Sequence, residues 1–130
     1  MNCLNRDVEI ALKFGPPARV DLAACYRIVD DFGWTSVIGN HISARIPRSD
    51  HLLINPFGLL YSEVTPSNLV KIDLDGNVLE PGDWPINPAG IVIHTAIHGA
   101  RPDVACVAHT HTVAGSAIAV GLTYAMNTSW

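Results

Sequence analysis

A short apolar run that ends in two histidines lies at Val104-Ala105-Cys106-Val107-Ala108-His109-Thr110-His111. The run predicts a buried β-strand, and because strand side chains alternate, both imidazoles lie on one face while Thr110 lies on the other. Two imidazoles on one face can bind one cation, as zinc ligands do. The alternative is a pair of ordinary histidines that hydrogen-bond to neighbouring groups. We favour a metal site, because two imidazoles at the end of an apolar strand are costly to bury without a common partner.

Hydrophobic spacing and turn residues predict the remaining elements. Asn87-Pro88 is typical of a helix start, and Gly33 is typical of a helix end. Helices are predicted at about 19–32, 91–100 and 113–120, and strands at 41–46, 51–54 and 104–111. Asp75-Gly76 predicts a type I′ turn in a hairpin of residues 69–74 and 77–80. Together these elements indicate a layered α/β domain with a partly antiparallel sheet.

A second pair of histidines, His94 and His98, is four residues apart on a predicted helix, which is also a metal-chelating spacing. Thr95 stands where the HExxH pattern of metalloproteases has its glutamate base. We therefore predict that these two imidazoles are packed or hydrogen-bonded groups of the helix face. His41 and His51 carry no spacing signal.

Other kinds of site have weaker support in the sequence. No serine lies in a GxSxG elbow and no cysteine has a local activating motif, so nucleophilic catalysis is set aside. Gly39-Asn40 and Pro56-Phe57-Gly58 are short glycine turns at strand ends. Their backbone N–H groups could hold an anion, although ordinary turn chemistry is the more frequent reason for such residues.

Length and charge limit the classes of protein that need to be considered. The chain has 130 residues, 8 Lys and Arg against 12 Asp and Glu, a net charge of −4 and 48% apolar residues. This composition predicts one folded domain and argues against a nucleic-acid partner. Gly15-Pro16-Pro17 marks a boundary, so we expect an N-terminal extension at 1–17 and the domain at 18–130.

Three cysteines without a CxxC motif indicate a reducing compartment, and charged residues near the N-terminus argue against a secretory signal. A cytoplasmic protein is therefore expected. From Val104 to Trp130 the chain has no charged residue, but two histidines, several hydroxyl residues and two glycines interrupt this stretch. We interpret it as buried elements of a soluble core rather than a membrane span.

Taken together, several motifs are similar to the N-terminal part of the class II aldolase and adducin family, over about residues 20–125. They are Gly39-Asn40-His41-Ile42-Ser43, Ile54-Asn55-Pro56-Phe57-Gly58, Asn87-Pro88-Ala89-Gly90, His94, Arg101-Pro102-Asp103 and Val107-Ala108-His109-Thr110-His111. The resemblance implies a three-layer α/β/α fold around a mixed, largely antiparallel sheet, and assembly as a homo-oligomer, usually a tetramer. It also implies zinc (Zn²⁺) held by three histidines in the family's enzymes.

Carried over to this sequence, the resemblance assigns the first two zinc ligands to His109 and His111. The family's third histidine lies further along the chain than Trp130, so we expect a domain that is incomplete at its C-terminus. Gly90 stands where the family's aldolases have their acid/base glutamate, and Pro88 and Ala89 stand where they have phosphate-binding serines. These departures resemble the adducin-like branch of the family.

The resemblance implies a zinc-dependent lyase ancestry. The expected chemistry is C–C cleavage or decarboxylation of a small oxygenated acid or sugar through a metal-stabilised enolate. The expected substrate-binding residues are Gly39, Asn40, Phe57 and Gly58, with no nucleic acid or membrane as partner. Whether the chain is an enzyme stays open, because the alternative is a non-catalytic adducin-like assembly module or an inactive fragment.

Overall fold

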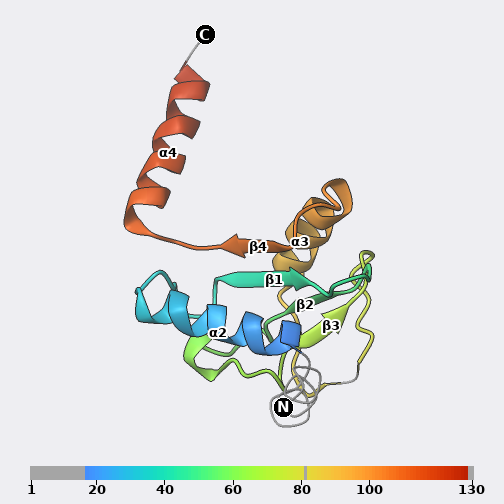
Figure 1. Cartoon of the computed structure of the whole chain (residues 1–130). Coiled ribbons are helices and arrows are strands. Elements are labelled where there is room, and N and C mark those ends of the chain that lie inside the picture. Colours follow the sequence, from blue (N-terminus) through green and yellow to red (C-terminus); the bar gives the residue numbers. More distant parts are fainter. Residues whose placement is uncertain (1–16, 81, 129–130) are drawn as a thin grey trace, which may run out of the picture.

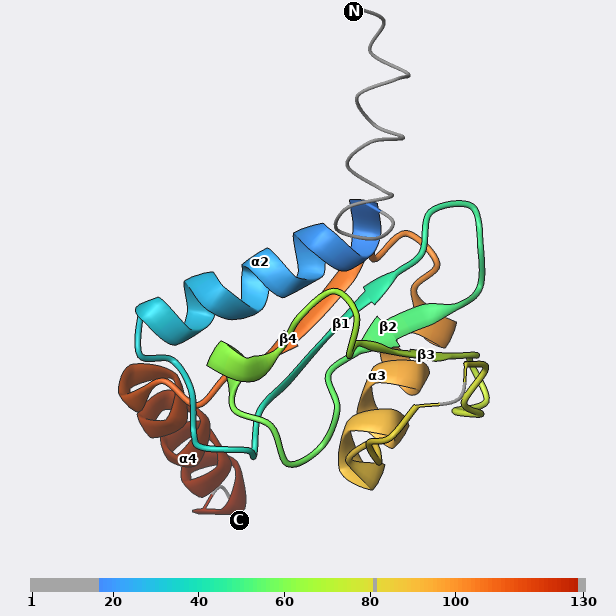
Figure 2. The same cartoon turned by 90° about the horizontal axis from the view of Figure 1, so that it is seen from below.

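The computed structural model describes residues 17–80 and 82–128, and within α4 it describes the side chains as far as residue 121. The elements, in chain order, are α2 (Pro17–Asp31), β1 (His41–Arg45), β2 (Leu52–Ile54), the 3-10 helix η1 (Tyr61–Glu63), β3 (Val70–Ile72), α3 (Pro88–Ala100), β4 (Cys106–His109) and α4 (Val113–Thr128). The strands form one sheet in the order β3-β2-β1-β4, and every pair in it is antiparallel. The expected largely antiparallel α/β fold is confirmed, with α2 and α3 on opposite faces of the sheet (Figure 1, Figure 2).

Helix α2 forms because apolar side chains recur at three- and four-residue spacing along one side. Leu22, Tyr26 and Val29 are buried on that side. The helix ends at Asp31 and is capped by Gly33, whose φ of +65° is easy only for glycine. The Gly33 N–H bonds to Asp30 O at 2.8 Å and the next N–H bonds to Val29 O at 3.1 Å, which is a Schellman cap. The predicted helix and its glycine end are confirmed.

Alternation along β1 and β2 divides their side chains between the two faces of the sheet. The face under α2 is apolar, and its buried cluster consists of Leu22, Tyr26, Val29, Ile42, Leu53, Tyr61, Val64 and Leu69. The opposite face is apolar along β2 and β3, where its cluster consists of Leu52, Ile54, Val70, Ile72 and Ile86. Along β1 this second face carries His41 and Ser43 instead.

The hairpin after β3 differs from the prediction. Only Gly76 of the Asp75-Gly76 pair has a positive φ, so the turn is not type I′, and the predicted strand 77–80 is reduced to a bridge between Ile72 and Val78. The Asp73 carboxylate accepts from the backbone N–H groups of Asp75 and Asn77 and from the Asn77 side chain. The Asp73 side chain thus competes with the backbone of the neighbouring strand for these N–H groups, which explains why the hairpin is shorter than predicted.

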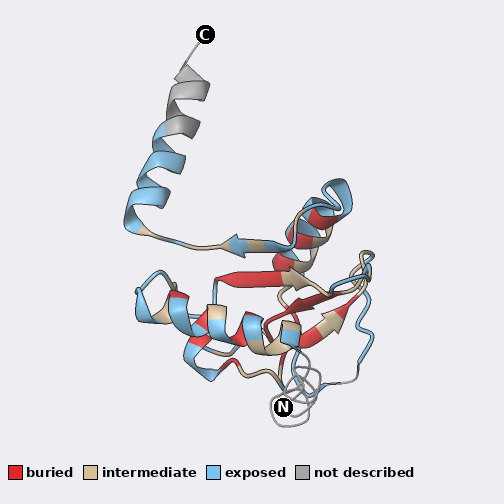
Figure 3. Ribbon diagram, in the orientation of Figure 1, coloured by how far each residue is buried: buried red, intermediate tan, exposed pale blue. Residues whose placement is uncertain are grey.

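The expectation that the C-terminal elements are buried is wrong for the residues described. Cys106 and Ala108 of β4 are exposed, and the side chains of α4 at 113–121 are exposed as well (Figure 3). β4 is an edge strand, and α4 leads away from the sheet rather than packing across it (Figure 1). Among the described helices none is both long and apolar enough to span a bilayer.

Candidate metal-binding site

His109 and His111 converge where β4 ends. His109 is the last residue of the strand, and the Nε2 atoms of the two imidazoles lie 3.0 Å apart. Two nitrogens bound tetrahedrally to one zinc ion at 2.0–2.1 Å would lie about 3.3 Å apart. The pair therefore has nearly the separation of two ligands of one cation.

Imidazole nitrogens are common zinc ligands, so His109 and His111 could supply two of the ligands of a zinc ion. Within residues 17–80 and 82–128 there is no group of three or more His, Cys, Asp or Glu that could hold a metal ion. Catalytic zinc sites keep three protein ligands, and here two are supplied. A third protein ligand would have to come from outside the described residues.

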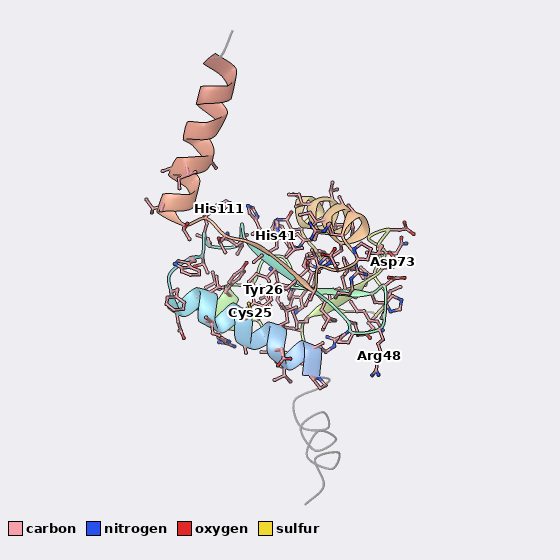
Figure 4. All side chains as sticks on the ribbon, turned by 45° about the horizontal axis from the view of Figure 1, so that its top comes forward. Cys25, Tyr26, His41, Arg48, Asp73 and His111 are labelled. Carbon is pink, nitrogen blue, oxygen red and sulfur yellow. The ribbon has the colours of Figure 1, made fainter. Side chains whose placement is uncertain are left out.

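His41 is the site residue that sequence reasoning missed. It lies on β1 (Figure 4), directly opposite His109 in the pairing of β1 with β4, and it is buried. His41 Nε2 is 3.2 Å from His109 Nδ1, and the two ring centroids are 4.5 Å apart. Strand alternation places His41 on one face with Ser43, but local spacing gives no information about which strand lies alongside.

Helix α3 brings two more imidazoles to the same place, both fully buried. His94 Nε2 is 2.7 Å from His41 Nδ1, and His94 Nδ1 is 2.5 Å from Ser43 Oγ. Ser43 Oγ is also 2.9 Å from His98 Nε2. The prediction that His94 and His98 are packed and hydrogen-bonded groups of the helix is confirmed.

Burial keeps these imidazoles neutral. Desolvation, followed by the neighbouring histidines, lowers the pKa of His41 and of His94 to about 4. Desolvation and then the Arg45 guanidinium lower the pKa of His98, against a hydrogen-bonding effect of the Val104 backbone. Desolvation and then His111 lower the pKa of His109. At pH 7 these rings carry lone pairs rather than charge, as metal ligands and hydrogen-bond acceptors require.

Gly90 lies against the ring of His41. A Cβ atom on Gly90 would be 3.2 Å from His41 Cδ2 and 3.3 Å from His41 Cγ. That is tighter than ordinary van der Waals contact, so the ring uses the space that a side chain at position 90 would need.

The loop before β1 carries the first of the predicted substrate-binding residues. Asn40 is buried; its Oδ1 accepts the N–H of Ser36, and its Nδ2 donates to His109 O at 3.2 Å. The Gly39 N–H donates to Ser36 O at 2.9 Å. The Asn40 side chain thus holds the loop to the end of β4, and a role for Gly39 and Asn40 in binding substrate stays a prediction.

The second glycine turn follows β2. Phe57 is half-buried and its N–H donates to Pro85 O, whereas Gly58 is exposed with a φ of +97° and nothing within 4 Å of a would-be Cβ. Asn55 Nδ2 lies 3.5 Å from Asn40 O, so the two turns are joined. Binding of substrate by Phe57 and Gly58 likewise stays a prediction.

Tyr26 holds these turns in place from the opposite side of the sheet. Its hydroxyl accepts the N–H groups of Ile42 and Asn55 at 3.0 and 3.1 Å, and Ile42 O and Asn55 Oδ1 are acceptors for its own proton. The hydroxyl therefore takes the place of direct strand pairing just beyond the Ser43–Ile54 pair. The hydrophobic spacing that predicts the helix gives no information about this role.

Comparisons with known proteins find similar sequences and structures. The model of the class II aldolase and adducin N-terminal domain matches residues 20–128. Alpha-adducin of Rattus norvegicus is 50% identical over 103 residues, which are 77% of this chain and 14% of that protein.

Two solved structures are also similar. An aldolase II superfamily protein from Pseudomonas syringae is 53% identical, with a TM-score of 0.74 over 78% of this chain. L-fuculose 1-phosphate aldolase from Glaciozyma antarctica PI12 is 35% identical, with a TM-score of 0.71 over 77% of this chain. The match covers 42% of each of those two chains, so this chain spans less than half the length of these relatives. The family-model match over most of the chain establishes that it belongs to the class II aldolase and adducin family.

Proposed function

We propose that this chain carries the first two ligands of a zinc-dependent lyase site, His109 and His111. The observation that supports this most directly is the convergence of their Nε2 atoms to 3.0 Å at the end of β4. The fold resembles that of L-fuculose 1-phosphate aldolase, with a TM-score of 0.71. When bound, zinc supplies Lewis-acid stabilisation of the negative charge that develops on a substrate oxygen.

The residues around the ligand pair favour one kind of lyase chemistry. Aldol cleavage needs a group that accepts the hydroxyl proton of the substrate, and Gly90 has no side chain with which to do so. Decarboxylation releases CO2 and leaves its electron pair next to a carbonyl, so it needs no base at position 90. We therefore propose decarboxylation of a small oxygenated acid ahead of aldol cleavage of a sugar.

The two glycine turns lie beside the end of β4 that carries the ligand pair. The turn at Gly39 and Asn40 is hydrogen-bonded to the backbone of His109, and Asn55 links it to the turn at Phe57 and Gly58. The N–H groups of Gly39 and Phe57 are engaged by Ser36 O and Pro85 O, whereas Gly58 is exposed, and exposed backbone at such a turn can bind carboxylate oxygens. We propose that these residues orient the substrate in a cytoplasmic homo-oligomer, with the third metal ligand supplied from outside the described residues.

The first experiment measures zinc binding to the purified 130-residue chain. We expect binding to approach about one zinc per chain at saturation, and the His109→Ala, His111→Ala double variant should lose it. His51→Ala serves as the control, because His51 lies in the turn before β2, apart from the imidazoles that β1, α3 and the end of β4 bring together. A folded wild-type chain that binds no zinc, or a double variant that binds it as well as wild type, would refute the proposed site.

A second candidate function is a non-catalytic adducin-like assembly module. It is favoured by the 50% identity to alpha-adducin over 103 residues and by the packing of His41 against Gly90, the position to which the resemblance assigns the glutamate of the aldolases. Zinc-loaded protein that releases neither CO2 nor an aldehyde from a panel of small hydroxy and keto acids and sugars would favour this candidate. Turnover that disappears in the His109→Ala, His111→Ala variant would favour the lyase.

A further inference from the structure

Four imidazoles and one hydroxyl form a continuous series of contacts between β4 and α3. They belong to His109, His41, His94, Ser43 and His98. From the ligand pair inward, His109 Nδ1 lies next to His41 Nε2 at 3.2 Å, and His41 Nδ1 lies next to His94 Nε2 at 2.7 Å. The series continues through Ser43 Oγ to His98 Nε2. Each ring nitrogen between His109 and Ser43 has one partner, so each contact can hold one proton between two acceptors.

A cation on His109 would select one direction for these protons. A histidine that binds metal through Nε2 carries its proton on Nδ1 and donates it to a second group. Here that group is His41 Nε2, which must then be unprotonated. His41 consequently carries its proton on Nδ1 and donates it to His94 Nε2, and His94 donates in turn to Ser43 Oγ. All of these donors and acceptors are then satisfied in a single arrangement.

The ring of His41 has little freedom to leave this position. It meets His94 edge-on at a centroid distance of 4.7 Å and His109 at 4.5 Å. Its Cδ2–Cγ edge lies over Gly90, and the residue is only 2% exposed. A side chain confined on three sides can hold its neighbour in one orientation, whereas an exposed histidine could not.

We propose that His41 is the positioning residue of the metal site: its Nε2 accepts the Nδ1 proton of His109 and fixes that ring with Nε2 directed at the cation. This inference rests on the proposed function, because it concerns the same two ligands. His41 itself does not touch the cation. Its partners on the far side, His94 and Ser43, fix the tautomer that makes Nε2 an acceptor.

The test compares two replacements of His41 by their affinity for zinc, measured by competition with a chromophoric chelator. His41→Leu removes the acceptor and should weaken zinc binding by about 10- to 100-fold, as is typical when such an outer partner is lost. His41→Gln places Oε1 close to where Nε2 was, so its affinity should stay within about threefold of wild type. His51→Leu is the matched control and should bind zinc as wild type does.

The outcomes separate this inference from the proposed function. A folded wild-type chain without zinc affinity refutes both, whereas zinc binding that is equally tight in wild type and His41→Leu refutes the role of His41 alone. Equal losses of zinc affinity in His41→Leu and His41→Gln also refute the role of His41, because they indicate an effect of packing rather than of the lost acceptor.

If His41→Leu does not fold, the ring nitrogens of zinc-loaded wild type give the answer by ¹⁵N NMR. His41 should be protonated on Nδ1 and unprotonated on Nε2, and the opposite tautomer would overturn the proposal.

Discussion

The two faces of the sheet use alternate residues of the same strands but are filled differently. Under α2, Ile42 and Leu53 belong to an apolar cluster, with the Tyr26 hydroxyl as a hydrogen-bonding centre. Under α3, the neighbours His41 and Ser43 join a hydrogen-bonded set of imidazoles. Along β1, the face under α2 thus contributes stability by burying apolar surface, and the face under α3 holds neutral polar groups in fixed orientations. The difference shows that strand alternation alone can keep the core and the site apart.

Among the substitutions, replacing Ile42 by alanine should have the largest effect on stability, because Ile42 is fully buried in the apolar cluster. We expect the free energy of unfolding to fall by about 3 kcal/mol, the usual range for a large-to-small change in a core. Urea denaturation measures it, with Val78→Ala at an exposed position as control. A loss below about 1 kcal/mol would mean that the α2 face is not the main source of stability.

Tyr26→Phe should have the next largest effect. The free energy of unfolding should fall by about 2 kcal/mol, because two buried N–H groups would lose their acceptor. Amide hydrogen exchange should speed up at Ile42 and Asn55 in particular. Unchanged exchange at both residues would show that the hydroxyl does not hold the ends of β1 and β2.

The histidine face should make the stability of the metal-free protein depend on pH. The pKa of His41 and His94 is about 4 in the folded chain against an ordinary value of 6.5, so the unfolded chain binds more protons between these values. Stability should therefore be full above pH 6.5 and should fall as the pH drops toward 4, by up to about 1.4 kcal/mol per pH unit for each histidine. Urea denaturation at several pH values measures the slope. The His41→Gln, His94→Gln double variant should have a shallower slope, and an equal slope would assign the dependence to other groups.

Two glycines of the same helix, α3, should differ in how their replacement by alanine changes stability, and both effects should be smaller than those above. Gly90→Ala should destabilise the chain by about 1 kcal/mol, because its Cβ would press on the confined ring of His41. Gly99→Ala, with nothing within 4 Å of the new Cβ, should be neutral or stabilise the helix by up to about 0.5 kcal/mol. Thermal unfolding of both variants is the measurement, and equal effects would show that His41 yields to the new side chain.

The smallest effect is expected from Tyr61→Phe. The Tyr61 hydroxyl is buried and has no hydrogen-bond partner among the described residues, although its ring packs edge-on against Tyr26 at 4.5 Å. Removing an unsatisfied hydroxyl should change the free energy of unfolding by less than about 0.5 kcal/mol, or raise it slightly. A loss as large as that of Tyr26→Phe would contradict the distinction between the two tyrosines.

Local features of the fold could be predicted from sequence, and features that depend on distant partners could not. Helix α2 and its Gly33 cap follow from spacing and one glycine. The convergence of His109 and His111 agrees with the prediction, although β4 ends at His109 and the predicted strand 104–111 is shortened to Cys106–His109. The place of His41 depends on the pairing of β1 with β4, two strands more than sixty residues apart in the sequence. The exposure of β4 and α4 depends on what packs against them, which an apolar run does not specify.

The close approach of His41 to Gly90 also restricts the order in which mutations could alter this site. A glutamate at position 90, as the resemblance assigns to the aldolases, needs space that the imidazole occupies. A single Gly90→Glu substitution should therefore displace the ring before any gain from the new carboxylate. We therefore expect positions 41 and 90 to be epistatically coupled, so that a smaller residue at position 41 lowers the cost of a glutamate at position 90.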